Sequence, residues 1–471
     1  MRDARTWAEE EFGHAELGDA RRTKRLVRLA SEVAGKPAGM VTRACRSSAS
    51  REGAFRLLES SVVHPEGVGR AVERATLRRC QRQRNVVVPI DGSSLTISDD
   101  DGDKQLGGVG ALDKGARGVQ VMTALALTSS GDTLGICGQH MWTRDAPSPH
   151  GPRGARGKQS ENRFWLDMLV DTQRAFSEQA PGCRPWFQMD RGADCWQVLA
   201  LSQAHGLLMT VRAAHDRRVD DVHGRLWSTV ERATVTAKRK IEVPARPAAQ
   251  RKKRVGGKRV TYLTKPRRAR IATVAIRAAK VQVQCTTATG RVLPVALNAV
   301  LVSEEGRGPD RIEWMLLTTH PIGIRRDMLE IVRGYTLRWR IEEFHRVWKR
   351  GLCRVEDTQL RSRNAIFKWA TILAAVATRA MRLTHLARST PNALATTEFS
   401  ETEIQAVVAL RQPKADYDLP NLTLAVVVRW VADLGGYTGP WNGPPGPTVI
   451  GRGLYDVLVA ARAFENRDKK R

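Results

Sequence analysis

The sequence predicts an α+β or α/β fold, in which a mixed β-sheet is covered by helices and flanked by helical segments at both ends. Short apolar runs, bounded by Gly and polar turn residues, come first in the central part of the chain. Strand and helix patterns then alternate, and both ends of the chain show apolar positions at helical spacing. Strands followed by strand–helix alternation are typical of a mixed sheet with helices on its faces. A chain of 471 residues should divide into two or three domains.

The N-terminal 70 residues have a helical pattern with clustered cations. Asp19 can cap a helix in which Leu26, Val27 and Leu29 turn inward. Its cations are Arg21, Arg22, Lys24, Arg25 and Arg28. A second helix is expected over Glu52–Glu59. The basic helix suits a phosphate backbone, although taken alone it is slightly better explained as a solvated surface helix.

The sheet is expected to begin near residue 85. The runs Val86–Ile90, Val119–Leu127 and Leu134–Trp142 predict a three-stranded meander. A helix over Asn162–Gln179 and a strand over Trp186–Met189 follow, and then a strand at Leu207–Arg212.

Residues 215–300 are predicted to form a basic, β-rich insertion. Residues 238–270 contain fourteen Lys and Arg but one acid, Glu242. The flanking segments Ala272–Ile276 and Lys280–Gln284 have β character. A disordered basic linker is the alternative interpretation of this region.

The C-terminal part is predicted to be helical. A long helix is expected over Asp327–Arg350, and further helices are expected over residues 365–386, 401–411, 421–434 and 448–466. The apolar stripe of the last helix is more often core than interface.

Net charge and cysteine usage limit the class of protein. The 77 Lys and Arg against 49 Asp and Glu give a formal net charge of +28, which favours a polyanion, usually nucleic acid, as partner. No apolar run approaches the ~20 residues that span a bilayer, and the N-terminus lacks the apolar segment of a signal peptide. The seven cysteines form no Cys-x-x-Cys pair, which fits a reducing cytoplasm.

One face of the helix near residue 340 gathers charged residues. With Tyr335 as origin and about 100° per residue, Arg338, Glu342 and Lys349 fall within an arc of roughly 60°. The opposite, buried side would carry Leu337, Ile341, Phe344, Val347 and Trp348. Considered alone, this helix is better explained as a surface ion-pair ladder.

Two aspartates each end a short apolar strand. Asp91 follows Val86–Ile90, and Asp190 follows Trp186–Met189. Reactive groups of α/β folds stand at strand ends, and a poorly solvated acid there needs a partner or a cation. If Asp91, Asp190 and Glu342 met, their oxygen ligands would suit Mg²⁺ or Mn²⁺, and two such ions could support phosphoryl transfer. Spacing in the sequence leaves their meeting open.

These residues resemble the insertion-sequence-4 family of transposases. Tyr335, Arg338, Glu342 and Lys349 stand at the spacing of the diagnostic helix of that family. Further segments are similar in the same order along the chain, namely Leu17–Val27, Glu52–Arg56, Asp190–Asp194, Leu297–Val300 and Trp314–Thr318. The likeness runs from about residue 7 to past residue 350.

The resemblance implies an RNase H-like catalytic core with Asp91, Asp190 and Glu342 as catalytic, metal-binding acids. The implied cofactor is a pair of Mg²⁺ ions, for which Mn²⁺ can substitute. The implied reaction nicks double-stranded transposon-end DNA, forms and reopens a hairpin, and joins the ends to target DNA.

The resemblance also implies the DNA contacts and the domain plan. Tyr335, Arg338, Lys349 and Arg212 would hold phosphates, and Trp314 would stack on a flipped base. The expected domains are a DNA-end-binding domain over 1–70, a catalytic domain over 71–385 and a dimerisation domain over 386–471, which pairs two protomers on DNA. The expected location is the bacterial cytoplasm, at the nucleoid.

Two other functions stay open from the sequence. One is a metal-dependent, structure-selective nuclease that does not join strands. The other is an inactive DNA-binding repressor derived from a transposase.

Overall fold

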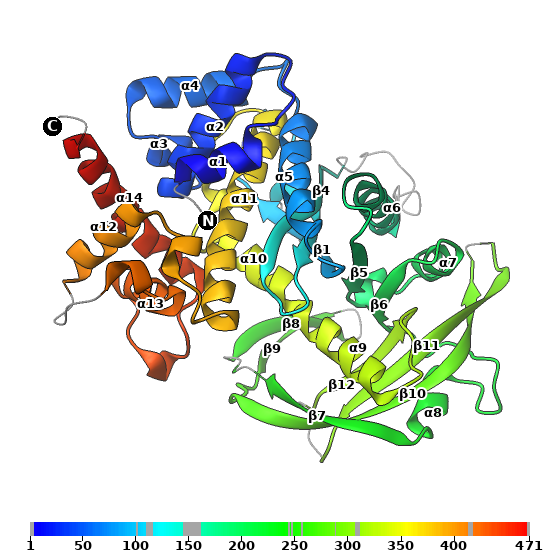
Figure 1. The fold of residues 1–471 in the computed structure, drawn as a ribbon. Coiled ribbons are helices and arrows are strands. Elements are labelled where there is room, and N and C mark those ends of the chain that lie inside the picture. Colours follow the sequence, from blue (N-terminus) through cyan, green and yellow to red (C-terminus); the bar gives the residue numbers. More distant parts are fainter. Residues whose placement is uncertain are drawn as a thin grey trace. The chain divides into compact units, whose positions relative to one another are not determined.

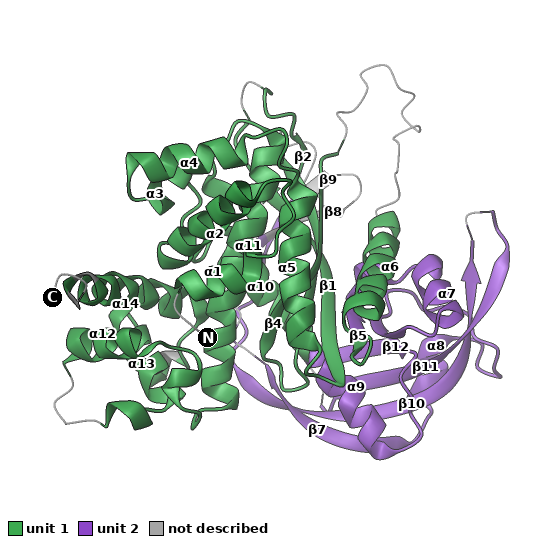
Figure 2. Cartoon of the chain, turned by 45° about the horizontal axis from the view of Figure 1, so that its top comes forward, with its two compact units in different colours: residues 1–186, 337–471 green, residues 187–336 purple. Residues whose placement is uncertain are grey.

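The computed structural model describes residues 4–99, 102–109, 116–144, 162–243, 245, 248–255, 258–287, 289–306, 311–412 and 418–468. The chain forms two compact units (Figure 2). Unit 1 comprises residues 1–186 and 337–471, and unit 2 comprises residues 187–336. Helices and strands follow in the order shown in Figure 1.

Unit 1 begins with five helices, α1 (Ala4–Phe12), α2 (Ala20–Gly35), α3 (Val41–Ala44), α4 (Ser48–Leu58) and α5 (Pro65–Cys80). The Asp19 carboxylate accepts the backbone N–H of Arg21 at 2.8 Å, so the predicted cap of α2 is confirmed. Helix α4 starts earlier than the sequence predicted, because Ser47 caps it.

The sheet of unit 1 contains the predicted antiparallel meander. Strand β3 (Arg117–Leu127) pairs with β1 (Asn85–Thr96), β2 (Gly107–Gly108) and β4 (Thr133–Trp142). Helix α6 (Asn162–Gln179) has the predicted bounds and packs on β3 and β4. Strand β5 (Arg184–Met189) follows, and the division between the units falls within it.

The prediction that Asp91 ends its strand is wrong. β1 continues to Thr96, and Asp91 pairs in register with Thr123 of β3. β1 is buried up to Ile90 and is mostly half-buried or exposed from Asp91 onward, so its apolar run stops at Ile90. The pairing of β1 with β3 nevertheless continues along the polar residues that follow.

The C-terminal part of unit 1 is built around helix α11 (Arg363–Ser389), which contacts α2, α4 and α5, strand β4, and the later helices α13 and α14. The later helices are α12 (Glu401–Arg411), α13 (Leu424–Leu434) and α14 (Pro447–Asp468). They share a core that includes Val407, Val427, Val431, Ile450 and Val457. The stripe of α14 is therefore core, as expected.

Unit 2 is dominated by antiparallel strands. Their order is β6 (Leu208–Arg212), β12 (Glu313–Thr318), β11 (Val292–Glu304), β10 (Arg270–Thr286) and β7 (Val235–Val243). Strands β8 (Ala249–Val255) and β9 (Lys258–Thr264) form a separate hairpin. The β-rich insertion is thus confirmed, and helices α7 (Trp196–Ala204), α8 (Leu226–Glu231) and α9 (Arg325–Leu337) accompany these strands.

The single long helix expected over Asp327–Arg350 is divided in two. Helix α9 ends at Leu337, and α10 (Trp339–Lys349) begins after Arg338. The division between the units also falls here, after Thr336. Tyr335 therefore belongs to unit 2, whereas Arg338, Glu342 and Lys349 belong to unit 1. Among the described residues, no helix is long and apolar enough to cross a membrane.

Candidate active site

Asp91 lies on β1 beside a histidine of α10. The preceding apolar residues of β1 are buried, and the Asp91 side chain is 14 % exposed. Its Oδ1 accepts the backbone N–H of Gly92 at 3.0 Å, and its Oδ2 lies 3.8 Å from Nδ1 of His345. Since His345 comes one helical turn after Glu342, the contact brings the helix that carries Glu342 against the strand that carries Asp91.

Glu342 lies in the first turn of α10 and is accessible. Its side chain is 41 % exposed, and its Oε1 lies 3.5 Å from both terminal nitrogens of Arg338. Most of the face predicted to be buried is buried, namely Ile341, Phe344, Val347 and Trp348, whereas Leu337 is half-buried. The structure therefore places two of the three predicted acids, Asp91 and Glu342, on β1 and α10, which pack against each other within unit 1.

Arg338 and Tyr335 do not lie on an exposed face, contrary to the helical projection. The Arg338 side chain is 7 % exposed and stacks over Trp339 at 5.1 Å. Tyr335 is 2 % exposed. The projection assumed one continuous helix, and the break at Arg338 removes that assumption.

Lys349 reaches β1 close to Asp91. Its Nζ lies 3.4 Å from Oγ of Ser93 and 3.7 Å from Oε1 of Glu356. Glu356 also accepts the backbone N–H of Thr96 at 2.9 Å and pairs with Arg350 at 2.9 Å. A cation is thereby held two residues along the strand from Asp91, where it can meet a phosphate.

His345 was missed by the sequence analysis. It is 9 % exposed at its side chain, and burial, together with the charges of Lys349 and Arg338, lowers its pKa to about 3. The imidazole that faces Asp91 is therefore neutral at physiological pH. The spacing of Glu342 and His345, three residues apart on one helix, was the available signal.

Glu343, next to the candidate acid, is committed to other partners. It accepts from Arg340 at 2.9 Å and lies 3.0 Å from Nε2 of His385. Burial alone would raise the pKa of Glu343. The hydrogen bond and charge of His385, together with the charge of Arg340, instead bring this pKa to about 2. Its role in unit 1 is to join α10 to α11.

Asp190 lies in unit 2, directly after β5 as predicted. Its Oδ1 accepts the backbone N–H of Gly192 at 2.7 Å and so caps the short turn Arg191–Ala193. The meeting of Asp190 with the two acids of unit 1 stays a prediction.

Three predicted DNA contacts of unit 2 lie near one another. Trp314 and Tyr335 make an edge-to-face contact, with ring centroids 5.3 Å apart. Arg212 donates from Nη2 to the backbone oxygen of Glu313, the neighbour of Trp314, at 2.9 Å. An indole held at its edge by a tyrosine keeps a defined orientation.

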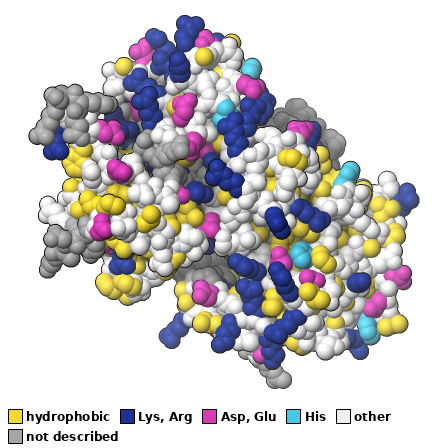
Figure 3. All heavy atoms as spheres, in the orientation of Figure 1, with side chains coloured by type: hydrophobic (Ala, Val, Ile, Leu, Met, Phe, Trp, Pro, Cys, Tyr) yellow, Lys and Arg dark blue, Asp and Glu magenta, His cyan; other side chains and the backbone are white. Residues whose placement is uncertain are grey.

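The predicted cations of α2 lie on its outer side. Arg21, Lys24 and Arg25 are exposed, and Arg22 is half-buried with a hydrogen bond to the backbone oxygen of Leu17 at 2.9 Å. The Arg25 guanidinium occupies the space that a Cβ would need at Gly53 of α4. Lys and Arg side chains gather over these N-terminal helices (Figure 3).

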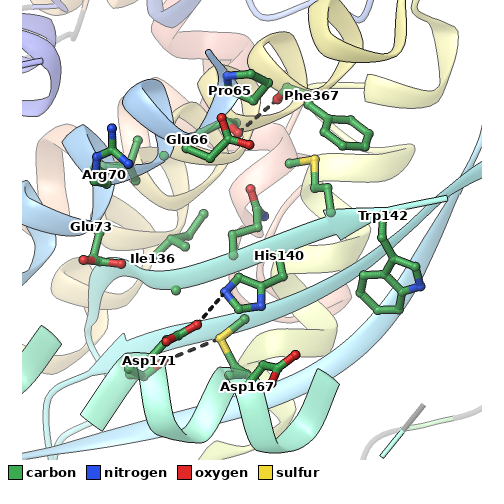
Figure 4. Close-up of a pocket in the computed structure, with 18 of the residues that line it drawn as sticks. Pro65, Glu66, Arg70, Glu73, Ile136, His140, Trp142, Asp167, Asp171 and Phe367 are labelled. Carbon is green, nitrogen blue, oxygen red and sulfur yellow. Dashed lines mark hydrogen bonds and ion pairs between the residues drawn. The ribbon is translucent and has the colours of Figure 1, made fainter. Parts of the chain in front are cut away.

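Unit 1 also contains a cavity between α5, β4 and α6, which is distinct from the candidate active site. It has a volume of about 410 Å³, and its lining includes Glu73, His140 and Asp171 (Figure 4). Nε2 of His140 lies 3.3 Å from Oδ2 of Asp171. None of the predicted site residues lines this cavity.

The donor atoms of the three acids fit a hard divalent metal, because carboxylate oxygen is the ligand that Mg²⁺ and Mn²⁺ prefer. Within the described residues, no three His, Cys, Asp or Glu side chains are grouped as a ready metal site. Of the three predicted acids, Asp91 and Glu342 lie in unit 1 and Asp190 lies in unit 2.

Two family models match the chain. A transposase DNA-binding model matches residues 4–63, which contain α1 to α4. A transposase DDE domain matches residues 156–379 and includes Asp190 and Glu342, whereas Asp91 lies outside both matches. DDE domains have an RNase H-like fold and use divalent metals, and the DNA-binding match makes DNA the partner. The chain therefore belongs to the DDE transposases, as an enzyme with a DNA-binding segment and an RNase H-like DDE domain.

Proposed function

We propose that the protein is a cut-and-paste transposase of the insertion-sequence-4 family, similar to the transposase of transposon five. It binds terminal inverted repeats, nicks the DNA, forms and reopens a hairpin, and joins the 3′-hydroxyl ends to target DNA. The observation that carries this proposal is the packing of α10 on β1, where His345 faces Asp91 one turn from Glu342. It supports Asp91, which neither family match contains, as the partner of Glu342.

The three acids have one role in this proposal. Asp91, Asp190 and Glu342 would hold two Mg²⁺ ions, and such ions would supply activation of the attacking hydroxyl and stabilisation of the leaving oxygen in an in-line displacement. Glu342 is accessible enough to serve, whereas Glu343 is occupied by Arg340 and His385.

The neighbouring side chains hold the DNA. Lys349, fixed between Ser93 and Glu356, takes a phosphate beside Asp91. Arg338 orients Glu342, and in a DNA complex it also faces phosphate. In unit 2, Trp314 accepts the flipped base, and Tyr335 supports its ring.

The domain plan belongs to the same proposal. Residues 1–70 recognise the transposon ends, 71–385 form the catalytic domain and 386–471 pair two protomers on DNA. Such a protein would act in a bacterial cell, at the nucleoid.

A cleavage assay tests the proposal. Purified protein is incubated with Mg²⁺ and linear DNA that carries the inverted repeats flanking its gene, and products are resolved on a denaturing gel. The parent and Glu330→Gln, which alters an exposed acid of α9, should both yield hairpin ends, whereas Glu342→Gln should yield none. Nicks without hairpins would favour a nuclease. Tight end binding by the parent without cleavage would indicate a repressor.

A further inference from the structure

A buried ion pair in unit 2 joins the segment after β5 to the segment after β6. The Asp194 side chain is 0 % exposed and accepts the backbone N–H groups of Ala214 at 2.6 Å and His215 at 3.2 Å. Nη1 of Arg217 lies 2.6 Å from Oδ1 and 2.7 Å from Oδ2 of Asp194. Its Nη2 donates to the backbone oxygen of Asp194 at 2.9 Å. Arg217 thus holds both the side chain and the backbone of Asp194.

Asp194 closes the turn that begins at Asp190. The backbone N–H of Ala193 donates to the oxygen of Asp190 at 3.2 Å, and that of Asp194 donates to Arg191 at 3.3 Å. The Asp190 carboxylate itself accepts the N–H of Gly192 within this turn at 2.7 Å. Because these bonds link one end of the turn to the other, a displacement of Asp194 would change the direction of the Asp190 carboxylate.

The segment that carries Arg217 is held at both ends. The N–H of Ala213 donates to the oxygen of Met315 in β12 at 2.8 Å. The oxygen of Arg217 accepts the N–H of Leu226, at the start of α8, at 3.0 Å. Arg217 is therefore a fixed point to which the turn of Asp190 is attached.

We propose that Asp194 and Arg217 are positioning residues, which hold the Asp190 carboxylate in the orientation that binds the divalent metal. The proposal rests on the function proposed above, in which Asp190 is a metal ligand. Groups that orient a ligand without touching the metal commonly alter metal affinity by about 10- to 100-fold when they are removed.

A second ion pair of unit 2 offers a matched control. Glu304 accepts Nε of Arg270 at 2.9 Å, Nη2 of Arg270 at 2.7 Å and the backbone N–H of Ile312 at 2.8 Å. Like Asp194, Glu304 is bound by a guanidinium and by a backbone donor. The pair of Glu304 and Arg270, however, joins β10 and β11 and includes no residue of the Asp190 turn. Its loss should affect stability without affecting Asp190.

The test measures metal binding rather than cleavage alone. Full-length parent, Asp194→Asn and Glu304→Gln are bound to end DNA, and the Kd for Mn²⁺ is obtained from the electron paramagnetic resonance signal of the free ion. We expect both variants to unfold at a lower temperature than the parent. The Kd should rise about 10-fold in Asp194→Asn and stay at the parental value in Glu304→Gln. A parental Kd in Asp194→Asn, or an equal rise in both variants, would overturn the positioning role.

A milder variant keeps the test decisive if Asp194→Asn does not fold. Arg217→Lys keeps the positive charge but cannot reach the carboxylate and the backbone oxygen together. Its Kd for Mn²⁺ should also rise, and a parental value in the folded protein would refute the proposal. Asp190→Asn tests the metal-binding role of Asp190 separately from the positioning role of Asp194 and Arg217. Unchanged Mn²⁺ binding in that variant would remove the metal-binding role of Asp190 itself, whereas loss of binding there leaves the positioning role to the other variants.

Discussion

At the scale of single residues, the two acids of α10 differ because of their partners. Glu343 is half-buried against Arg340 and His385, which keep it ionised with a pKa of about 2. Glu342 has Arg338 at 3.5 Å and an exposed side chain. The helical projection placed Glu342 on the charged face of this helix, and the packing of α10 on α11 makes Glu343 the acid that joins the two helices and leaves Glu342 the more accessible one.

Glu73 gives a pH-dependent prediction at this scale. Burial, together with the charge of Asp171, raises its pKa to about 7, although the hydrogen bond from Gln179 and the charges of Arg174 and Arg70 oppose the shift. Between pH 4.5 and about 7 the folded protein therefore keeps a proton that the unfolded chain has lost, and stability falls as pH rises through that window. Glu73→Gln removes this loss. Its gain in free energy of unfolding over the parent should be roughly 2 kcal/mol larger at pH 8 than at pH 5.

Urea unfolding at the two pH values measures this difference. Glu66→Gln, which alters an exposed acid of the same helix, serves as the control, and its free energy of unfolding should follow that of the parent at both pH values. A Glu73→Gln protein whose stability follows the parent at both pH values would contradict the prediction.

At the scale of elements, strand β1 and helix α10 form the part of the candidate site that unit 1 contains. β1 is buried up to Ile90 and then continues as a polar strand, so that Asp91 and Ser93 lie within a paired strand rather than on a loop. Side chains on a paired strand hold their positions better than those on a loop. α10 brings His345 and Lys349 to the same stretch of β1.

Helix α2 gives a prediction for DNA binding. Arg21, Lys24 and Arg25 are exposed cations in the segment that matches the transposase DNA-binding model. If each neutralises a phosphate, replacing all three by Gln should reduce the slope of log K against log salt by roughly 3. Affinity for end DNA, measured by fluorescence anisotropy between 50 and 200 mM salt, gives this slope.

A cation outside that segment is the control for α2. Arg411 of α12 is also exposed and pairs with Asp433 at 3.4 Å. Arg411→Gln should leave the slope near the parental value. An unchanged slope in the triple α2 variant would mean that these cations do not contact phosphate.

At the scale of the whole molecule, the transposase DNA-binding match and the DDE match cover different segments of the chain. The DNA-binding match ends at residue 63, and the DDE match begins at residue 156. Chelation of divalent metal should therefore abolish cleavage, while the Kd for end DNA changes less than about threefold, because lysines and arginines supply most of the affinity. Gel shift and cleavage assays on the same samples measure both quantities. Cleavage that persists in excess chelator would contradict a metal-dependent mechanism.

The sequence by itself determined the features that depend on local chemistry. The pattern of apolar runs and turn residues predicted the meander and the helix α6, the β character of the segments beside the basic run predicted the β-rich insertion, and Asp19 predicted the start of α2. The end of β5 before Asp190 also followed from its short apolar run. These features persist because burial of an apolar face and capping of a helix are decided by residues close together in the chain.

Only the tertiary structure decided which of the predicted residues are buried and which separate elements contact one another. The break at Arg338 buries Tyr335 and Arg338, the pairing with β3 extends β1 past Asp91, and His345 reaches Asp91 across 254 positions of sequence. The ion pair of Asp194 with Arg217 is of the same kind. Such contacts depend on how separate elements pack, and the periodicity of one helix or strand contains no information about the partner that covers it.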